Sequence, residues 1–439
     1  MKMQRKIMAA IITAVLLLTA CTGAPGEVTV NAEPRTELIL SGIMLDPKIR
    51  EQVVNYNKTN KDYYITIEDY VQYEYPEAVE QRNLRIISGS PPDIMIVSGV
   101  DYCKYVDKDI FLDLSSYYEQ DQAIDRADIY ENVLESIKVE DRLYGITSEF
   151  ALRMLVTEKR FLPEALTFER MNEIQSTSAY PLLVTAGQDE LLLYLTLFYF
   201  DQFIDWESAA CNFSNQQFFE LLEMVKNCPP IIDPNIILDK KENGEPIFFP
   251  VHMTDVYMYQ KYSNFFGGEL ICTGYPDGEG NLMHAVPTNI FAVSSQTKHS
   301  QAAWDFISLF LEADYQSDYA DQMAGITMSR TALQKLLTNA QHEGPVNNES
   351  FVEDRLELGD YHDEIYAITA QTAEEFTTLL ESDFRAEIRY DQAIIDIIVE
   401  ECGYYLNENS NENQGDDRTA QQVADSINNR VTIYLQEQE

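Results

Sequence analysis

Basic residues are scarce in this chain of 439 residues. Its 31 lysines and arginines stand against 73 aspartates and glutamates, which gives a formal net charge of −42. Nucleic-acid phosphates demand a basic face, so the charge argues against a nucleic-acid partner. It also argues against electrostatic docking on anionic lipid and favours a neutral or cationic ligand. The simplest explanation of the excess acid is solubility on a crowded surface.

Cysteine and histidine are few as well, with six and five residues. Five cysteines remain after Cys21, and this odd number excludes a complete disulfide framework while leaving open whether any two of them pair. No CxxC pair occurs, and no two histidines stand at HxxxH or HExxH spacing, so we predict no metal site.

Catalytic and cofactor motifs are missing too. The sequence has no GxSxG nucleophile motif and neither of the phosphate loops GxxxxGK[ST] and GxGxxG, so we predict no catalytic residue and no cofactor. A glycosidase carboxylate pair could still stand among the acidic residues, because such a pair leaves no pattern in a sequence. The missing motifs agree with a binding protein rather than an enzyme.

The beginning of the chain is a clear signal for export. Three basic residues precede an apolar run over 7–18, and Leu18-Thr19-Ala20-Cys21 follows with small residues. Twelve residues that rise about 1.5 Å each cannot cross a hydrocarbon core of about 30 Å, so this run is too short for a membrane-spanning helix.

The Leu-Thr-Ala-Cys segment resembles the lipobox of bacterial lipoproteins, in which the cysteine becomes the first mature residue and carries lipid. The resemblance implies a lipoprotein signal peptide over 1–20, lipidation of Cys21 and a tether over 21–36. The mature protein would then be anchored at the extracytoplasmic face of the bacterial cell membrane. An ordinary signal peptide with a chance cysteine is the alternative.

Folding is predicted to begin at Glu37, with alternating strands and helices. Strands are expected over 38–40, 65–68 and 93–97, with helices between them over 47–59 and 77–87. This order predicts a largely parallel sheet covered on both faces. Ligands of such sheets lie beyond the carboxyl ends of the strands.

Further elements follow. The apolar run over 191–203 predicts a core helix rather than a membrane segment, since it is too short to span. Thr419 and Gln422 form a capping box at the start of the closing helix. Strands are expected over 143–147, 181–184 and 290–293, and a helix over 301–311.

Several segments share the motifs of one protein family. The stretch 51–60 ends in Asn-Lys-Thr-Asn, 88–94 reads Ser-Gly-Ser-Pro-Pro-Asp-Ile, and 141–146 reads Asp-Arg-Leu-Tyr-Gly-Ile. Taken in order, they resemble the first helix, the "SGxxPDI" motif and the "GKLYGIP" crossing of the family 1 extracellular solute-binding proteins of ABC importers, the group that includes maltose-binding protein. Thr147 stands in place of the usual proline, so the backbone there is expected to differ locally.

Later segments carry the same resemblance over nearly all of the mature chain. The stretch 203–213 resembles a hairpin of one branch of the family, 274–307 its return crossing and the helix that follows, and 423–435 its closing helix. Asp93, inside the "SGxxPDI" motif, is interpreted as structural because it starts a strand. Trp206, inside the hairpin, is interpreted as packing.

The resemblance implies an α/β fold of the periplasmic-binding-protein-like type II class, with two α/β lobes joined by a hinge of crossing segments. Lobe 1 would comprise 37–148 plus 290–325, and lobe 2 would comprise 149–289 plus 326–439. A monomer of this kind would close on a small solute and deliver it to ABC permease subunits. The aromatic-rich composition favours a sugar, most simply an oligosaccharide, while a polyol or a peptide stays open.

In this family aromatic faces and charged side chains hold the sugar, and the resemblance directs the choice of ligand-binding residues. Those of lobe 1 follow the second and third strands, and those of lobe 2 follow the first crossing, a strand-to-helix turn and a later strand. An interlobe salt bridge is the alternative role for Arg153. The candidates are Tyr70, Tyr73, Asp101, Tyr102, Glu149, Phe150, Arg153, Gln188, Asp189, Asp255, Tyr257 and Tyr259.

Two other functions stay open at this point. A surface glycoside hydrolase would need two carboxylates facing each other across a cleft and would turn over the bound sugar. A sensory binding protein would present its closed, liganded form to a receptor, and the sequence does not separate this role from transport.

Overall fold

The computed structural model describes most of the chain beyond the leader and tether. It covers residues 34–438 with internal gaps. The gaps are 98, 163–165, 178–181, 184–187, 207, 228–233, 277–280, 343–366, 387, 389–390 and 407–417. Cys21 and the predicted signal peptide lie outside the described residues.

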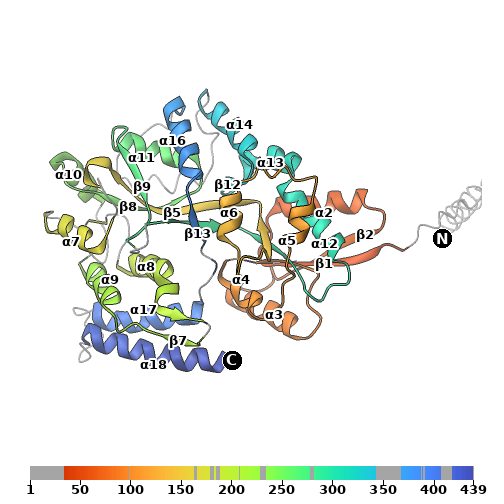
Figure 1. The fold of residues 1–439 in the computed structure, drawn as a ribbon, viewed down its shortest axis with the longest axis horizontal. Coiled ribbons are helices and arrows are strands. Elements are labelled where there is room, and N and C mark those ends of the chain that lie inside the picture. The colour runs from red at the N-terminus through yellow and green to blue at the C-terminus, as the bar shows by residue number, and fades with distance from the viewer. Residues whose placement is uncertain are drawn as a thin grey trace, which may run out of the picture.

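The described residues form a five-stranded sheet in the order β2-β1-β3-β11-β4 (Figure 1). The strand β1 pairs in parallel with β2 and β3, and β11 is antiparallel to β3 and β4. The strands are β1 (Thr36–Gly42), β2 (Tyr63–Asp69), β3 (Ile94–Val97), β4 (Gly145–Thr147) and β11 (Ile290–Val293). The helices that alternate with the first strands are α2 (Pro47–Thr59), α3 (Tyr75–Ile87) and α4 (Gly99–Val106). The predicted order of strands and helices at the start of the fold is therefore confirmed.

A second sheet is built around the long strand β5. Its described strands number six, and β8, β9, β10 and β12 all pair antiparallel with β5, while β13 pairs in parallel with β10. The pairing registers place β10 and then β9 along one edge of β5, and β12 and then β8 along the other. The strands are β5 (Glu149–Glu158), β8 (Phe248–Met253), β9 (Leu270–Thr273), β10 (Met283–Pro287), β12 (Ile326–Thr327) and β13 (Phe384–Ala386).

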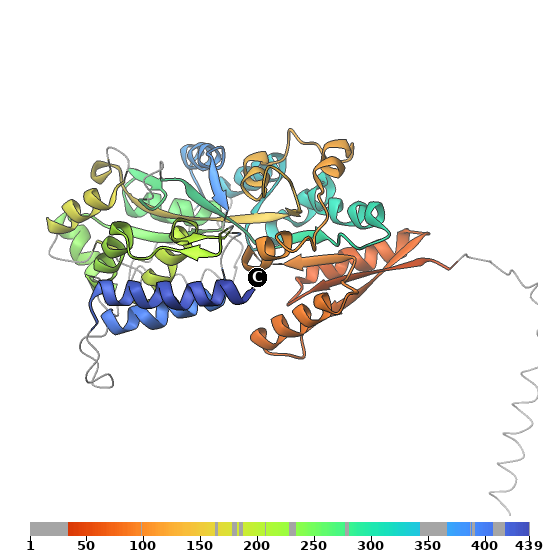
Figure 2. The same cartoon turned by 60° about the horizontal axis from the view of Figure 1, so that its bottom comes forward.

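Helices cover both sheets, and a short hairpin of β6 (Ile204–Asp205) and β7 (Ala210–Cys211) follows α8. The helices around the five-stranded sheet include α5 (Ser115–Gln120), α12 (Ser300–Ile307), η2 (Ser308–Leu311), α13 (Ala313–Tyr319) and η3 (Ala320–Gln322). At the junction of the sheets, α6 (Glu131–Ser136) contacts β13 and α14 (Arg330–Ala340) contacts β12. Those around the six-stranded sheet are η1 (Lys159–Phe161), α7 (Phe168–Ser176), α8 (Gln188–Phe203), α9 (Gln216–Lys226), α10 (Pro234–Asn243), α11 (Val256–Phe265), α16 (Ala370–Leu380), α17 (Gln392–Leu406) and α18 (Ala420–Gln438). The last two run side by side beneath this sheet (Figure 2).

Local chemistry accounts for where these helices begin. The Asp46 carboxylate accepts a hydrogen bond from the Lys48 N–H at 2.7 Å, which caps α2 ahead of its first-turn proline. At α18 the Thr419 N–H donates to the Gln422 side chain at 2.9 Å, and the Gln422 N–H donates back to the Thr419 hydroxyl at 3.3 Å. The predicted capping box is confirmed.

Two apolar cores divide the faces of the six-stranded sheet. On β5, Leu152, Met154 and Val156 belong to a first core, which also contains the strands of the five-stranded sheet. Leu155 points to the opposite face and belongs to a second core, together with α8, α17 and α18. Because α8 is part of the second core, the predicted core helix over 191–203 is confirmed. No helix within the described ranges has the length and hydropathy needed to cross a bilayer.

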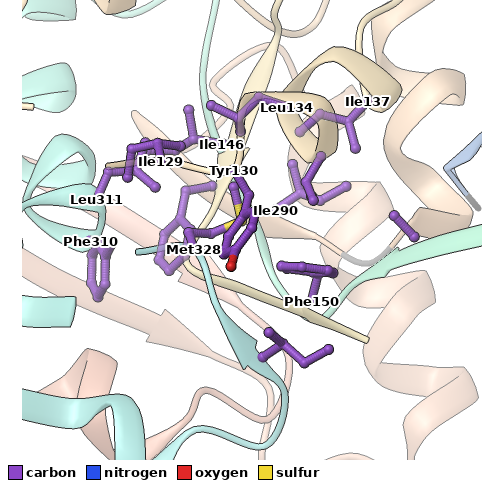
Figure 3. Packing of buried hydrophobic residues seen from close by; sticks show 14 of the residues in the cluster. Ile129, Tyr130, Leu134, Ile137, Ile146, Phe150, Ile290, Phe310, Leu311 and Met328 are labelled. Carbon is purple, nitrogen blue, oxygen red and sulfur yellow. The ribbon is translucent and has the colours of Figure 1, made fainter. Parts of the chain in front are cut away.

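The first core runs without a break from one sheet to the other. Tyr130, Ile146, Phe150, Ile290 and Met328 pack together where the sheets meet (Figure 3). Each of these side chains is at most 1% exposed. The junction between the sheets is therefore a close-packed apolar body rather than a loose linker.

Candidate ligand-binding region at the crossing segments

Three passages of the chain meet between the two sheets. The strand β4 leads into β5 through Ser148, and β10 leads into β11 through residues 288–289. The third passage includes β12, which pairs with Glu149 and Phe150 at the start of β5. At the first crossing the Thr147 hydroxyl donates to the Glu149 carbonyl at 2.7 Å. The Thr147 side chain thus supplies a hydrogen bond that spans Ser148.

A buried amide ties two of these passages together. Gln316 of α13 is 0% exposed, and its Nε2 donates to the carbonyls of Ser148 at 3.0 Å and Phe310 at 2.6 Å. Its Oε1 accepts from the Thr327 hydroxyl and from the Ser329 N–H. Both amide protons and both lone pairs are used, so the side chain fixes the first passage against the third.

A buried carboxyl group stands at the same place. Glu149 is 2% exposed, and burial raises its pKa, as does the charge of Asp46. The Lys48 ammonium and the N–H groups of Ala324 and Gly325 act in the opposite direction. Glu149 therefore lies close to the loop that follows β1, the first of the strand ends where the sequence predicted a ligand.

The residues predicted on the side of the five-stranded sheet lie in different environments. Tyr70 is buried and its hydroxyl donates to Glu68 at 2.9 Å, whereas Tyr73 is half-buried in the turn after β2. Tyr102 is 0% exposed, and its hydroxyl accepts from the Tyr144 N–H at 3.1 Å. Its ring therefore packs in the core and presents no face to a solute, because α4 turns this position inward.

Two further predicted residues give different outcomes. The backbone of Asp101 belongs to α4, but its side chain lies outside the described residues. Phe150 is 0% exposed and lies beside Tyr130 (Figure 3), with 6.1 Å between the ring centroids. The ring centroid of Phe384 is 6.4 Å from that of Phe150. The ring of Phe150 is therefore part of the first core at the junction of the sheets.

Gln188 and Asp189 open α8, and the turn predicted before them lies outside the described residues. The Gln188 Nε2 donates to the Lys226 carbonyl at 3.2 Å, so this amide joins α8 to the end of α9. The side chain of Asp189 lies outside the described residues.

The remaining predicted residues lie on or beside α11. The Asp255 carboxylate caps this helix, accepting from the N–H groups of Tyr257 at 2.7 Å and Met258 at 3.0 Å. Tyr259 is buried, and its hydroxyl donates to Glu375 of α16 at 3.3 Å. Tyr257 is half-buried. The contacts of Asp255 and Tyr259 therefore hold helices in place.

Sequence reasoning found Arg153 but missed the side chains beside it. The structure pairs Arg153 on β5 with His252 on β8 and with His284 on β10, and it pairs His284 with Arg385 on β13. We call these four residues the basic row. In the sequence, each of these residues is a single basic or imidazole side chain within a largely apolar segment. Only the register of the strands brings the four together.

The flanks of the two sheets also touch directly. The Lys104 ammonium of α4 lies 3.8 Å from the carboxylate of Asp391, which precedes α17, and the Cys103 N–H donates to the Ile388 carbonyl at 3.4 Å. On the other side, the Asn132 amide donates to the Leu380 and Ser382 carbonyls at 2.8 and 2.7 Å. The segment 380–391 thus joins the six-stranded sheet to α4 and α6.

Comparison with known proteins gives fold-level likeness at low sequence identity. No family model matches the sequence, and no curated protein matches it. Among solved structures, the sugar-binding protein MalE from Xanthomonas citri superposes with a TM-score of 0.57 at 14% identity, covering 92% of this chain and 98% of MalE.

Two other structures agree. The ABC substrate-binding protein Lmo0181 from Listeria monocytogenes, in complex with cycloalternan, gives a TM-score of 0.53 at 14% identity, over 92% of this chain and 100% of that protein. An extracellular solute-binding protein of family 1 from Alicyclobacillus acidocaldarius gives 0.54 at 12% identity, over 92% and 99%. The chain has the periplasmic-binding-protein-like fold of these proteins, and the predicted fold class is confirmed.

Replacing Gln316 by leucine should destabilise the protein strongly. The Gln316→Leu change keeps similar bulk but leaves the buried Ser148 and Phe310 carbonyls and the Ser329 N–H without this partner. Since each unsatisfied buried group costs about 1–3 kcal/mol, we expect a loss of about 3 kcal/mol or more in urea unfolding. Gln301→Leu, on the exposed side of α12, should cost less than about 0.5 kcal/mol. Equal effects of the two changes would contradict the assigned role of Gln316.

The buried carboxyl group predicts a pH dependence with a definite sign. Because the folded state raises the pKa of Glu149, that state holds its proton more tightly than the unfolded chain does. This contribution to stability is complete below the ordinary value of 4.5 and is lost as the pH rises above it. The free energy of unfolding of the wild type, minus that of Glu149→Gln, should therefore fall between pH 4 and 7. A constant or rising difference would show that burial does not disfavour the charge.

Proposed function

We propose that this protein is a lipid-anchored, extracytoplasmic solute-binding protein that delivers a small solute, most simply an oligosaccharide, to an ABC import permease. One observation supports the proposal above all others. Two α/β units meet at three adjacent chain passages, in a fold shared with proteins described as a sugar-binding protein and an ABC substrate-binding protein in complex with cycloalternan.

In the proposed mechanism the two units are lobes that close on the solute. Lobe 1 comprises 37–148 plus 290–325, and lobe 2 comprises 149–289 plus 326–439. Closure needs torsion only at the few backbone positions that leave one sheet and enter the other, while the packed junction stays intact. A solute that binds the closed form more tightly shifts the population toward it, and the permease reads the closed shape.

Charged side chains of both units lie near the places where the units meet. The loop after β1 carries Asp46 and Lys48, and these charges act on the buried Glu149 carboxyl group at the first crossing. The Lys104–Asp391 pair lies where α4 meets the start of α17. Polar groups from both units therefore converge around the crossing segments, as a pocket between two lobes requires.

A thermal-shift panel of sugars, polyols, amino acids and peptides tests the proposed function. A ligand at a hundred times its Kd should add about 2.7 kcal/mol to the free energy of unfolding, which raises Tm by about 3 °C for a chain of this length. We expect such a rise with one sugar class, and the sugar should be recovered intact after incubation.

Other outcomes of the panel would count against the proposal. Cleavage of the bound sugar would identify a glycoside hydrolase instead. A shift with amino acids or peptides alone would support a solute-binding protein but contradict the assignment of a carbohydrate as its solute. If no compound shifts Tm, the proposed solute-binding function would lose its support, and only the assignment of the fold would stand.

Lipid anchoring is tested separately, by labelling a bacterial host that expresses the full chain with radioactive palmitate. The wild type should incorporate label and Cys21→Ser should not, because serine has no thiol to carry the lipid. Cys211→Ser, which alters a half-buried thiol of the folded region, should keep the label. Label retained in Cys21→Ser, or absent from the wild type, would contradict anchoring through Cys21.

A further inference from the structure

We propose that the basic row, Arg153, His252, His284 and Arg385, recognises an oxyanion carried by the solute. The solute would be an acidic carbohydrate that bears a carboxylate or a phosphate ester. This inference rests on the proposed function and names the class of solute, an anion, where the net charge of the chain favoured a neutral or cationic ligand.

Strand register places the four side chains in one line. Arg153 is the direct partner of His252 and of His284, and His284 is the direct partner of Arg385. Side chains of directly paired residues lie on the same face of a sheet, and adjacent strands are about 4.8 Å apart. The row therefore crosses four neighbouring strands and extends over about 14 Å.

The row lies between the second core and the crossing segments. Two residues beyond Arg153 on β5, Leu155 is 0% exposed and belongs to that core. In the other direction β5 reaches its pairing with β12 at Phe150 and Glu149. The row thus lies where the second core ends along this face of β5, on the side toward the crossing segments.

The exposure of the four side chains is graded rather than uniform. His252 is exposed, Arg153 and Arg385 are half-buried, and His284 is 6% exposed. Half-buried guanidinium groups lose less of their interaction energy to water than exposed ones do. Such groups form short, paired hydrogen bonds with a carboxylate or phosphate.

Packing of the sheet alone does not account well for four basic side chains at these positions. Guanidinium and imidazole groups pack less well than apolar side chains at such directly paired positions of a sheet. Each of the four side chains also has an interaction within the protein, so none of them is without a partner. We infer that an arriving oxyanion adds to this arrangement and that the row selects it.

The row gathers basic side chains in a chain that is strongly acidic as a whole. The chain carries −42, yet the row gathers two guanidinium and two imidazole groups within about 14 Å. Charges beyond the Debye length of about 8 Å at physiological salt are largely screened in water, so nearby groups dominate what a bound solute meets. The acidic surface therefore does not prevent selection of an anion at this row.

The test compares matched sugars on the full mature protein by calorimetry. The probes are glucose, glucuronate and glucose 6-phosphate, with galactose, galacturonate and galactose 6-phosphate as a second series. We expect an acidic member to bind at least tenfold more tightly than its neutral counterpart. A preference for glucuronate or galacturonate would identify a carboxylate as the oxyanion, and a preference for a sugar phosphate would identify an ester.

Variants then assign the preference to the row. Arg385→Gln and the milder His252→Gln should weaken binding of the preferred acidic sugar, by about tenfold or more for the arginine, since truncating one partner of a charged pair is costly. Binding of the neutral sugar should change little, which also shows that the variants fold. Arg385→Lys should restore only part of the loss, because lysine lacks the planar fork.

A matched control separates local from global charge. Arg170→Gln makes the same change in net charge on the exposed face of α7, and it should leave binding of the acidic sugar unchanged. An equal loss in Arg170→Gln, or neutral sugars bound as tightly as acidic ones, would overturn the inference while leaving a sugar-binding protein. Failure of every sugar, here and in the thermal-shift panel, would overturn the carbohydrate solute of the proposed function as well.

Discussion

The structure depends on one constraint: the chain passes between the two sheets three times, and the passages stay together. The fully used amide of Gln316 fixes two of them, and the packed side chains around Phe150 surround them. Water does not compete for these hydrogen bonds because the amide is buried. Any relative motion of the sheets therefore has to occur around this body and not through it, which makes the crossing a pivot of fixed position.

Much of the architecture could be predicted from the sequence because it follows from local periodicity and capping. Alternating apolar runs gave the first strands, Asp46 gave the start of α2, and Thr419 with Gln422 gave the start of α18. The ordered motifs then indicated the fold class. The register of β5 against its neighbours could not be predicted, because pairing between strands as distant as β8, β10 and β13 depends on tertiary packing.

The candidate site was less predictable for the same reason. Position near the end of a strand is visible in a sequence, but the direction of a side chain is not. Tyr102 follows the third strand, yet α4 directs its ring into the core. The Asp255 carboxylate caps α11. The four members of the basic row are scattered over 233 positions from Arg153 to Arg385, and each is unremarkable until the sheet assembles them.

The place of β11 has a consequence for synthesis of the protein. This strand lies between β3 and β4 in the five-stranded sheet, although its residues come more than 140 positions after β4 in the chain. The sheet cannot be completed until residue 293 has left the ribosome, and β3 keeps an open edge until then. Pairing over such separations is slow, so the early strands must wait, unpaired on one side, while the whole of β5 to β10 is made. A nascent chain of this kind benefits from being held unfolded until its synthesis is nearly complete.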